Sequence, residues 1–361
     1  MGLTRVRQEH GKGDLIKIKA IAVWDTVGAL GIPQVSWLNR IGITPSNKEF
    51  QFYDTNLSDR IEHAFQALAL DETRPPFAPA VWERLPTNQS TTDLRQVWFP
   101  GNHGNCGGGW PDQGVANISL AWMMDQLASV GVEFDDDAFT ALLDRTRKFY
   151  ETSGAATAAA KVPWGVSPLY ENNRPFRPWG LAAIEKASSW LYALAGTTMR
   201  TPGLYKQVDA KTRREKGYLQ DTNERIHASV RIRLACKGLG LNDKGVWGNP
   251  AMKGWRLVKR DPSSSARGGA GGGGGGSKTV AGASAATEVA AQNWGPPANL
   301  QEMVDEEGWG WEWDGKDEKN APPARRLEEE SMGPYERFWL RKAGGGEPSV
   351  WQVAAQEVVG K

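Results

Sequence analysis

The sequence predicts an α/β fold with parallel strands. Two short apolar runs, residues 15–24 and 94–99, have the length and composition of strands buried in a sheet. Apolar residues at helical spacing lie between them, and a loop follows each run. Strand, helix and strand in this order form a βαβ unit, whose two strands run parallel. A sheet of this kind is expected to be covered on both faces.

The elements of this unit follow one another along the chain. Residues 15–24 alternate in their first half and are continuously apolar in their second, which is typical of a strand entering a buried sheet. We predict a helix over about residues 58–70, because Ser58 can cap it and an apolar stripe follows. The stripe consists of Ile61, Phe65, Leu68 and Ala69. Residues 71–86 contain four prolines and predict a loop, and residues 94–99 form the second strand.

Helical patterns predominate in the rest of the chain. The predicted helices cover about residues 115–130, 136–150, 181–194 and 334–342. A further helix is predicted after Asn223, because Ile226, Val230 and Leu234 are spaced i, i+4, i+8. Residues 151–180 contain many Ala, Pro and Gly residues and predict an irregular, partly helical cap.

One change in composition divides the chain. Residues 261–292 have low complexity and include a Gly-Gly-Ala-Gly-Gly-Gly-Gly-Gly-Gly run at 268–276. Such a run cannot bury enough apolar surface to offset the entropy lost on ordering. We therefore expect a partial α/β domain over residues 1–260, a Gly-rich linker or loop over 261–292, and a charged, Trp-rich segment over 293–361.

The number of strands raises a difficulty. The sequence shows only two convincing parallel strands, and two such strands cannot form a doubly covered sheet. Either further strands are hidden in the second half of the chain, or the remaining strands lie in sequence that these 361 residues do not contain.

The composition excludes several classes of function. The formal net charge is +1, from 43 basic and 42 acidic side chains, so no overall field attracts nucleic acid or an anionic membrane. Two cysteines, Cys106 and Cys236, cannot form a disulfide framework. There is no secretory signal and no transmembrane segment, which predicts a cytoplasmic protein. The 17 tryptophans are interpreted as packing anchors, with an aromatic surface for sugar or lipid as the alternative.

Two polar residues stand where catalytic groups of open α/β sheets are found, just beyond a strand. Asp25 follows the first strand and His103 follows the second. An acid followed by a histidine suits the last two members of a Ser…Asp…His triad. From the residues alone, Asp25 can equally be an Asx-turn residue and His103 an ordinary loop histidine.

The other candidates have weaker patterns. The glycines at 107–109 would let backbone N–H groups approach a ligand, or simply form a tight turn. Cys106 is a candidate nucleophile only if it faces His103, which residues three apart in a loop need not do. His227 is the alternative base, whereas His63 is expected on a helix and His10 in a polar terminus. No pattern predicts a metal site or another cofactor.

Several blocks of sequence resemble a known family. They are Ala22-Val-Trp-Asp-Thr-Val-Gly-Ala-Leu-Gly-Ile-Pro33, residues 63–74, residues 97–109, residues 118–124 and residues 224–233. Their sequence and order resemble the phospholipase-like catalytic domain of bacterial type VI lipase effectors, a domain that is also widespread in fungi. The resemblance covers about residues 15–260. It implies an α/β-hydrolase fold and hydrolysis of carboxylic or phospholipid esters by a serine enzyme.

The resemblance also implies roles for particular residues. It assigns Asp25 as the triad acid and His103 as the base, with His227 as a rival because it also lies in a family block. Members carry a Gly-x-Ser-x-Gly turn before the first of these blocks, and no such motif occurs in this sequence. Asn105 and Cys106 stand where members often have Asp and Val, which puts the local orientation of His103 in doubt.

Three functional hypotheses follow. The first is a truncated member of the serine lipase and esterase family, inactive as given because it lacks the nucleophile. The second is a non-catalytic binding or interaction protein that uses its Trp-rich segment and the cap. The third is a hydrolase with another nucleophile, such as Cys106. An ester or lipid is the expected substrate of an intact relative; nucleic acid is not an expected partner, and the oligomeric state stays open.

Overall fold

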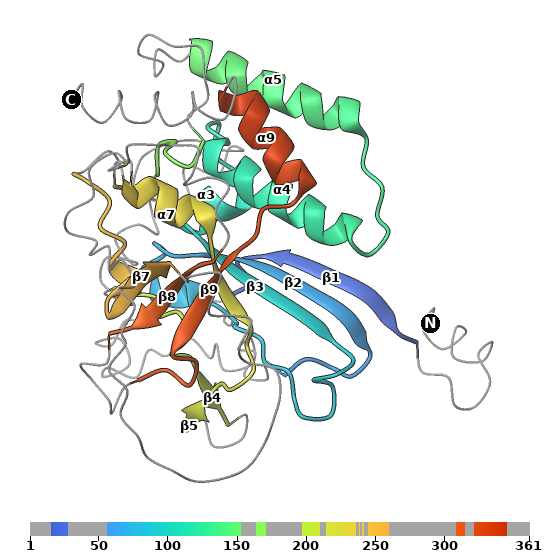
Figure 1. Ribbon diagram of the computed structural model, residues 1–361, viewed down its shortest axis with the longest axis vertical. Coiled ribbons are helices and arrows are strands. Elements are labelled where there is room, and N and C mark those ends of the chain that lie inside the picture. Colours follow the sequence, from blue (N-terminus) through green and yellow to red (C-terminus); the bar gives the residue numbers. More distant parts are fainter. Residues whose placement is uncertain are drawn as a thin grey trace, which may run out of the picture.

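The computed structural model describes ten stretches of the chain, and the predictions for residues 181–194, 261–292 and most of 151–180 lie outside them. These stretches are residues 16–27, 56–152, 164–170, 197–209, 214–235, 238, 240–241, 245–259, 308–314 and 321–344. They form an α/β structure in which helices pack against one face of a mainly parallel sheet (Figure 1). The predicted fold class, α/β with parallel strands, is confirmed.

The central sheet has seven strands in the order β1-β2-β3-β6-β9-β8-β7. Their bounds are β1 Ile18–Trp24, β2 Ile61–Ala69, β3 Asp93–Phe99, β6 Glu224–His227, β9 Arg326–Glu330, β8 Trp309–Trp313 and β7 Trp255–Lys259. Neighbouring strands are parallel from β1 to β9, whereas β8 and β7 run antiparallel. A separate antiparallel pair consists of β4, Lys206–Val208, and β5, Glu215–Tyr218.

Several predicted elements are confirmed. The strands at 15–24 and 94–99 are β1 and β3, which both pair with β2. The helices are α3 His103–Gly107, α4 Gly114–Ala128, α5 Asp136–Thr152, α7 Ala228–Ala235 and α9 Pro334–Gly344, with 3-10 turns at Pro75–Phe77 and Pro250–Met252. Of these, α4, α5 and α9 match helices that the apolar spacing predicted.

The helix predicted over residues 58–70 is wrong, because this segment is the strand β2. Both of its faces are buried: Phe65, Ala67 and Ala69 point to the helices, and Ala64 and Leu68 point the opposite way. A strand buried on both faces is nearly continuously apolar, so apolar residues at helical spacing occur in it by necessity. Pairing with β1 and β3 overrides the local helix propensity.

The helix expected after Asn223 begins later than predicted. Residues Glu224–His227 are the strand β6, and α7 starts only at Ala228, so Ile226 belongs to the sheet. The two-strand count is therefore wrong: β2 was hidden by its helix-like spacing, and β6 to β9 come from the second half of the chain. Residues 308–314 and 321–344, placed by composition in the charged C-terminal region, contribute β8, β9 and α9.

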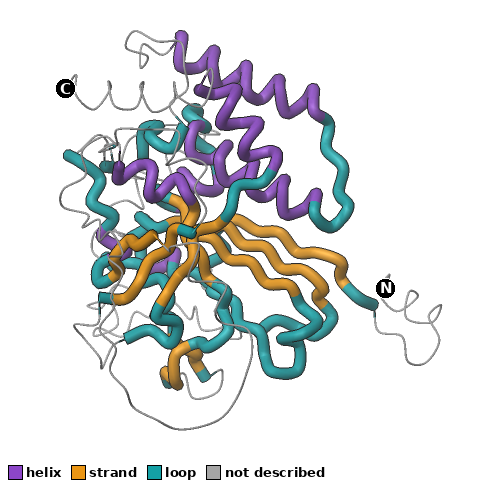
Figure 2. The backbone as a smooth tube through the Cα atoms, viewed as in Figure 1, coloured by secondary structure: helices purple, strands orange, loops and turns teal. Residues whose placement is uncertain are grey.

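The two faces of the sheet have different coverings (Figure 2). On one face, Val97 and Phe99 of β3 pack with Ile118 and Trp122 of α4 and with Trp339 of α9. The opposite face, toward which Trp98 of β3 points, has a separate core cluster. This cluster is rich in tryptophan and includes Trp98, Trp247, Trp255, Trp309 and Trp311. For these residues the interpretation as packing anchors is confirmed, since each is less than a tenth exposed.

Helix α9 is fixed to the helical layer by its first turn. The Asp125 carboxylate of α4 accepts hydrogen bonds from the backbone N–H groups of Tyr335 (2.8 Å) and Glu336 (3.0 Å). These are two of the N–H groups that a helix start leaves without partners. The Glu336 side chain in turn meets His227 Nε2 at the end of β6, at 2.5 Å. The chain's last described helix is thereby tied both to α4 and to the sheet.

The Asp125 contact makes the docking of α9 depend on pH. Burial raises the pKa of Asp125 to about 6, against the two backbone hydrogen bonds that lower it. A carboxyl whose pKa is raised in the folded protein contributes most below its unfolded pKa, and this contribution is lost as pH rises through 6. We expect Asp125→Asn to gain roughly 1–2 kcal/mol relative to the wild type as pH rises from about 4 to 7.

Urea unfolding at several pH values measures this difference. Asp144→Asn is the control, because Asp144 also lies on a helix but is 62% exposed. The control should show no such trend. A wild-type-to-Asp125→Asn difference that stays constant with pH would show that burial of this carboxyl does not govern the docking.

Candidate active site

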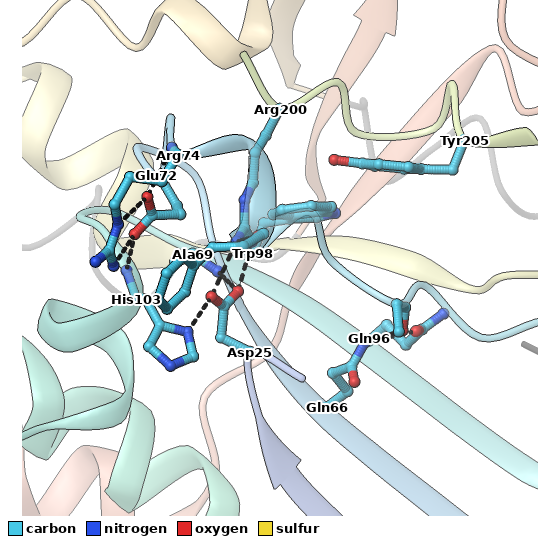
Figure 3. A network of polar contacts seen from close by, with 12 residues as sticks. Asp25, Gln66, Ala69, Glu72, Arg74, Gln96, Trp98, His103, Arg200 and Tyr205 are labelled. Carbon is cyan, nitrogen blue, oxygen red and sulfur yellow. Dashed lines mark hydrogen bonds and ion pairs between the residues drawn. The ribbon is translucent and has the colours of Figure 1, made fainter. Parts of the chain in front are cut away.

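The candidate site lies where the three strands β1, β2 and β3 end side by side (Figure 3). Asp25 follows β1, Asp71 and Glu72 follow β2, and Gly101 and His103 follow β3. All three strands are parallel, so their carboxyl ends meet at one edge of the sheet, which is where α/β folds place ligands. Asp71 joins two of the ends, because its Oδ2 accepts from the backbone N–H of Gly101 at 2.6 Å.

Asp25 is positioned by the way in which β1 ends. Its backbone N–H still donates to Ala67 of β2, but its φ of 46° turns the chain away from the sheet. Aspartate is one of the few residues that tolerate this left-handed conformation. The Asp25 Oδ1 then accepts from the backbone N–H of Ala69 at 2.9 Å, in place of the carbonyl that a longer strand would have offered. The carboxylate is completely buried.

Asp25 and His103, 78 residues apart in the sequence, are in direct contact: His103 Nδ1 lies 2.7 Å from Asp25 Oδ2. Burial alone would raise the pKa of Asp25, but the Arg200 charge and hydrogen bonds from His103 and Arg200 outweigh burial and lower it. An ionised carboxylate only accepts hydrogen bonds, so His103 Nδ1 is the donor in this contact. The His103 side chain is 36% exposed, which leaves the ring accessible.

His103 is held in place by the short helix that it begins. The N-cap Asn102 accepts from the backbone N–H of Asn105, whose side chain accepts in return from the backbone N–H of Asn102. Asn105 therefore has a structural role of its own. Although family members often have Asp at this position, the Asn105 side chain still helps to fix the turn that orients His103. The edge of the His103 ring also packs on Phe77, with 5.1 Å between ring centroids.

Arg200 completes the site, and sequence reasoning missed it. Its Nη1 lies 2.5 Å from Asp25 Oδ1 and its Nη2 lies 2.9 Å from Oδ2, so the guanidinium binds the carboxylate with both arms. Arg200 comes from segment 197–209, whose sequence carries no motif that singles it out. Glu72 was missed as well, because the helix predicted over 58–70 hid its place just past a strand; its Oε2 accepts from the backbone N–H of His103 at 3.3 Å.

The rival base His227 has a different environment. It is completely buried, its Nδ1 lies 2.7 Å from Ser229 Oγ and its Nε2 contacts Glu336. Its ring stacks on Phe99 with 4.4 Å between centroids. His227 thus has its own hydroxyl and carboxylate partners, Ser229 and Glu336, and its burial excludes solvent and substrate from the ring.

The remaining candidates do not join the site chemistry. Cys106 is completely buried, and burial raises the pKa of its thiol well above the usual range, so it lacks the thiolate that a nucleophile needs. His63 lies on β2 rather than on a helix, 3.5 Å from Asp93. Gly108 and Gly109, which follow α3, have φ of 88° and 104° and form the turn out of that helix. His10 lies outside the described residues.

Two further properties concern only the part of the chain that the structure describes. Within it, no group of three or more His, Cys, Asp or Glu side chains could hold a metal ion. Of the helices described, none combines the length and the apolar character that a membrane crossing requires.

Comparison with known proteins gives two similarities. Residues 3–126, about a third of the chain, match the family model described as "T6SS, Phospholipase effector Tle1-like, catalytic domain". A stretch of 53 residues is 40% identical to the uncharacterized protein YEL023C of Saccharomyces cerevisiae, covering 13% of this chain and 8% of the yeast protein. No solved structure matches the chain. Asp25 and His103 both lie within the residues that match the family model, whereas Arg200 and His227 lie outside them.

The buried Asp25–Arg200 pair predicts a pH-dependent loss of stability on mutation. Asp25→Asn leaves the buried Arg200 charge without the carboxylate that neutralises it, which we expect to cost about 3–5 kcal/mol at pH 7. Because the pKa of Asp25 is lowered, its contribution is present above the unfolded pKa and is lost as pH falls through the folded pKa. The difference from the wild type should therefore shrink below about pH 4.

Denaturant unfolding across this pH range measures the effect. The matched control is Asp221→Asn, which removes another two-armed contact, that with Arg84, at a position where both side chains are 20% exposed. It should cost about 1 kcal/mol, because water partly solvates the separated groups. Equal losses in the two variants would contradict the account of a buried, strongly coupled Asp25.

Proposed function

We propose that Asp25 and His103 are the acid and the base of a serine ester hydrolase of the phospholipase-like type. The observation that carries the proposal is the contact between a buried carboxylate and His103 Nδ1 at the carboxyl ends of parallel strands. This is the geometry in which an acid fixes the tautomer of a catalytic imidazole. The match of residues 3–126 to the phospholipase effector family supports it.

The chemistry follows from the state of the ring. His103 Nε2 takes the proton of a serine hydroxyl as the serine oxygen attacks the ester carbonyl, and Asp25 stabilises the imidazolium that forms. The imidazolium then gives this proton to the departing alcohol, which leaves an acyl-serine. His103 next activates a water molecule that hydrolyses the acyl-serine, so the acid is released and the serine regains its proton.

The nucleophile is the missing part. These 361 residues contain no Gly-x-Ser-x-Gly turn, and Cys106 cannot replace it. We propose that the serine is supplied by polypeptide outside this sequence and that the chain as given is inactive. In the described part, β1 is the edge strand of the sheet, and Asp25 stands at its end. A further parallel strand beside β1 would therefore end next to the acid–base pair.

The substrate class is proposed from the family. The name of the matched family specifies a phospholipase, so a carboxylic ester of a lipid is the proposed substrate. The cytoplasmic location stays a prediction. The non-catalytic alternative relies in part on the Trp-rich segment as a binding surface, but Trp309 and Trp311 are buried side chains of the strand β8. Among the described residues, no particular contact favours that alternative.

The test begins with the protein as it exists. The 361-residue chain is expected to show neither labelling by a fluorophosphonate nor hydrolysis of p-nitrophenyl butyrate or phosphatidylcholine vesicles. The intact mass of the native product and the 5′ end of its transcript then show whether a Gly-x-Ser-x-Gly segment precedes Asp25. A native product without this segment would contradict the proposal and favour a binding protein.

A native product that contains the segment should hydrolyse these esters. His103→Gln should then lower kcat by about 10⁴-fold, because the serine loses its base. His63→Gln is the matched control: His63 also lies within the family match but its neighbour is Asp93, so kcat should be unchanged. Full activity of the folded His103→Gln protein would exclude His103 as the base.

A further inference from the structure

Arg200 and His103 share one carboxylate. Arg200 Nη2 and His103 Nδ1 both meet Asp25 Oδ2, at 2.9 and 2.7 Å, while Arg200 Nη1 meets Oδ1. Arg200 is 2% exposed at its side chain and Asp25 is not exposed at all. Figure 3 shows the carboxylate between the guanidinium and the imidazole. A guanidinium in this place touches the acid but not the ring that performs the proposed chemistry.

We propose that Arg200 is a positioning residue that acts on His103 through Asp25, by fixing the carboxylate and by neutralising its charge. Arg200 keeps the His103 ring neutral and its Nε2 free to accept a proton. The inference rests on the proposed function, because it takes Asp25 and His103 as the catalytic acid and base.

The geometry fixes the carboxylate in both position and plane. An ionised carboxylate has about four sites for accepting hydrogen bonds. On Asp25 these are met by the backbone N–H of Ala69, by the two arms of Arg200 and by His103 Nδ1. Arg200 Nη2 also donates to the carbonyl of Phe77 at 2.7 Å. The ring of this same Phe77 packs on His103, so Arg200 restrains the imidazole indirectly, both through Asp25 and through Phe77.

Arg200 neutralises the carboxylate beside the ring. The titratable and charged groups that interact with the ring, with its carboxylate or with their partners are Asp25, Arg200, Glu72, Arg74, Asp71, Cys106 and Arg233. Asp25 is paired with Arg200, and Glu72 is paired with Arg74 at 2.9 Å. Burial raises the pKa values of Asp71 and Cys106, while the Arg233 charge acts on Asp71 in the opposite direction. The Asp25–Arg200 and Glu72–Arg74 pairs thus supply no net negative charge that would hold an extra proton on His103.

Removing the Arg200 charge changes this balance. In Arg200→Gln the buried Asp25 carboxylate would have His103 as its main compensating partner, which favours the imidazolium. An imidazolium cannot act as a base. If Arg200 only anchored segment 197–209, its loss would shift the titration midpoint of His103 in the opposite direction. The site would loosen and Asp25 would move away. His103 would then lose an anionic neighbour and hold its proton less strongly.

The experiment follows the titration of His103 by NMR in the 361-residue chain. The chain has four histidines, so the His103 signals are assigned by their loss in His103→Gln. The titration midpoint of His103 in Arg200→Gln is expected to move up by about one pH unit or more. Arg200→Lys keeps the positive charge and should leave the midpoint within a few tenths of a unit of the wild type. An unchanged or lower midpoint in folded Arg200→Gln would overturn the inference.

If Arg200→Gln does not fold, a measurement on the wild-type protein tests the inference instead. The Nη–H signals of Arg200 share the Asp25 carboxylate with His103, so they should shift with the same midpoint as the ring; signals that stay constant would overturn the inference. Asp25→Asn separates the two proposals. The Asp25→Asn change should lower the titration midpoint of His103. An unchanged midpoint would contradict the assignment of Asp25 and His103 as an acid–base pair. If the His103 midpoint is lower in Asp25→Asn but unchanged in Arg200→Gln, the acid–base pair stands and the proposed role of Arg200 is contradicted.

Discussion

The structure of the site depends on one buried carboxylate. Asp25 is removed from water at the end of an edge strand, which is unfavourable for an ionised group unless it is paired and hydrogen-bonded. Its four contacts come from β2, from the first residue of α3 and from segment 197–209. The need to satisfy this single group therefore brings together parts of the chain that are as far as 175 residues apart.

The rest of the fold provides the support that this arrangement requires. Parallel pairing of β1, β2 and β3 places their carboxyl ends at one edge of the sheet, and buried residues on both faces fix the register. Helices cover one face and a tryptophan-rich cluster covers the other. Within this rigid frame the His103 ring remains about one-third exposed while its acid is fully buried. That asymmetry suits a base, which must reach a substrate while its orienting partner stays out of water.

The sequence predicted the parts of the site that follow recognisable strands. The first and third strands are short apolar runs, so Asp25 and His103 could be located just beyond them and correctly brought together. Residues 61–69 were misassigned because a strand buried on both faces also contains apolar residues at helical spacing, and this error hid Glu72. Arg200 could not be found from local pattern at all. Its role arises only from a long-range contact with Asp25, which no spacing or composition within residues 197–209 records.

The most direct test of the central claim is the protonation state of the two ring nitrogens of His103. Nitrogen-15 NMR of the 361-residue chain at neutral pH distinguishes a nitrogen that carries hydrogen from one that does not. A buried, ionised Asp25 in contact with Nδ1 predicts a hydrogen on Nδ1 and a bare Nε2. A ring with its hydrogen on Nε2 would leave only Nδ1 bare, the nitrogen that faces Asp25, and would contradict the assignment of Asp25 and His103 as an acid–base pair.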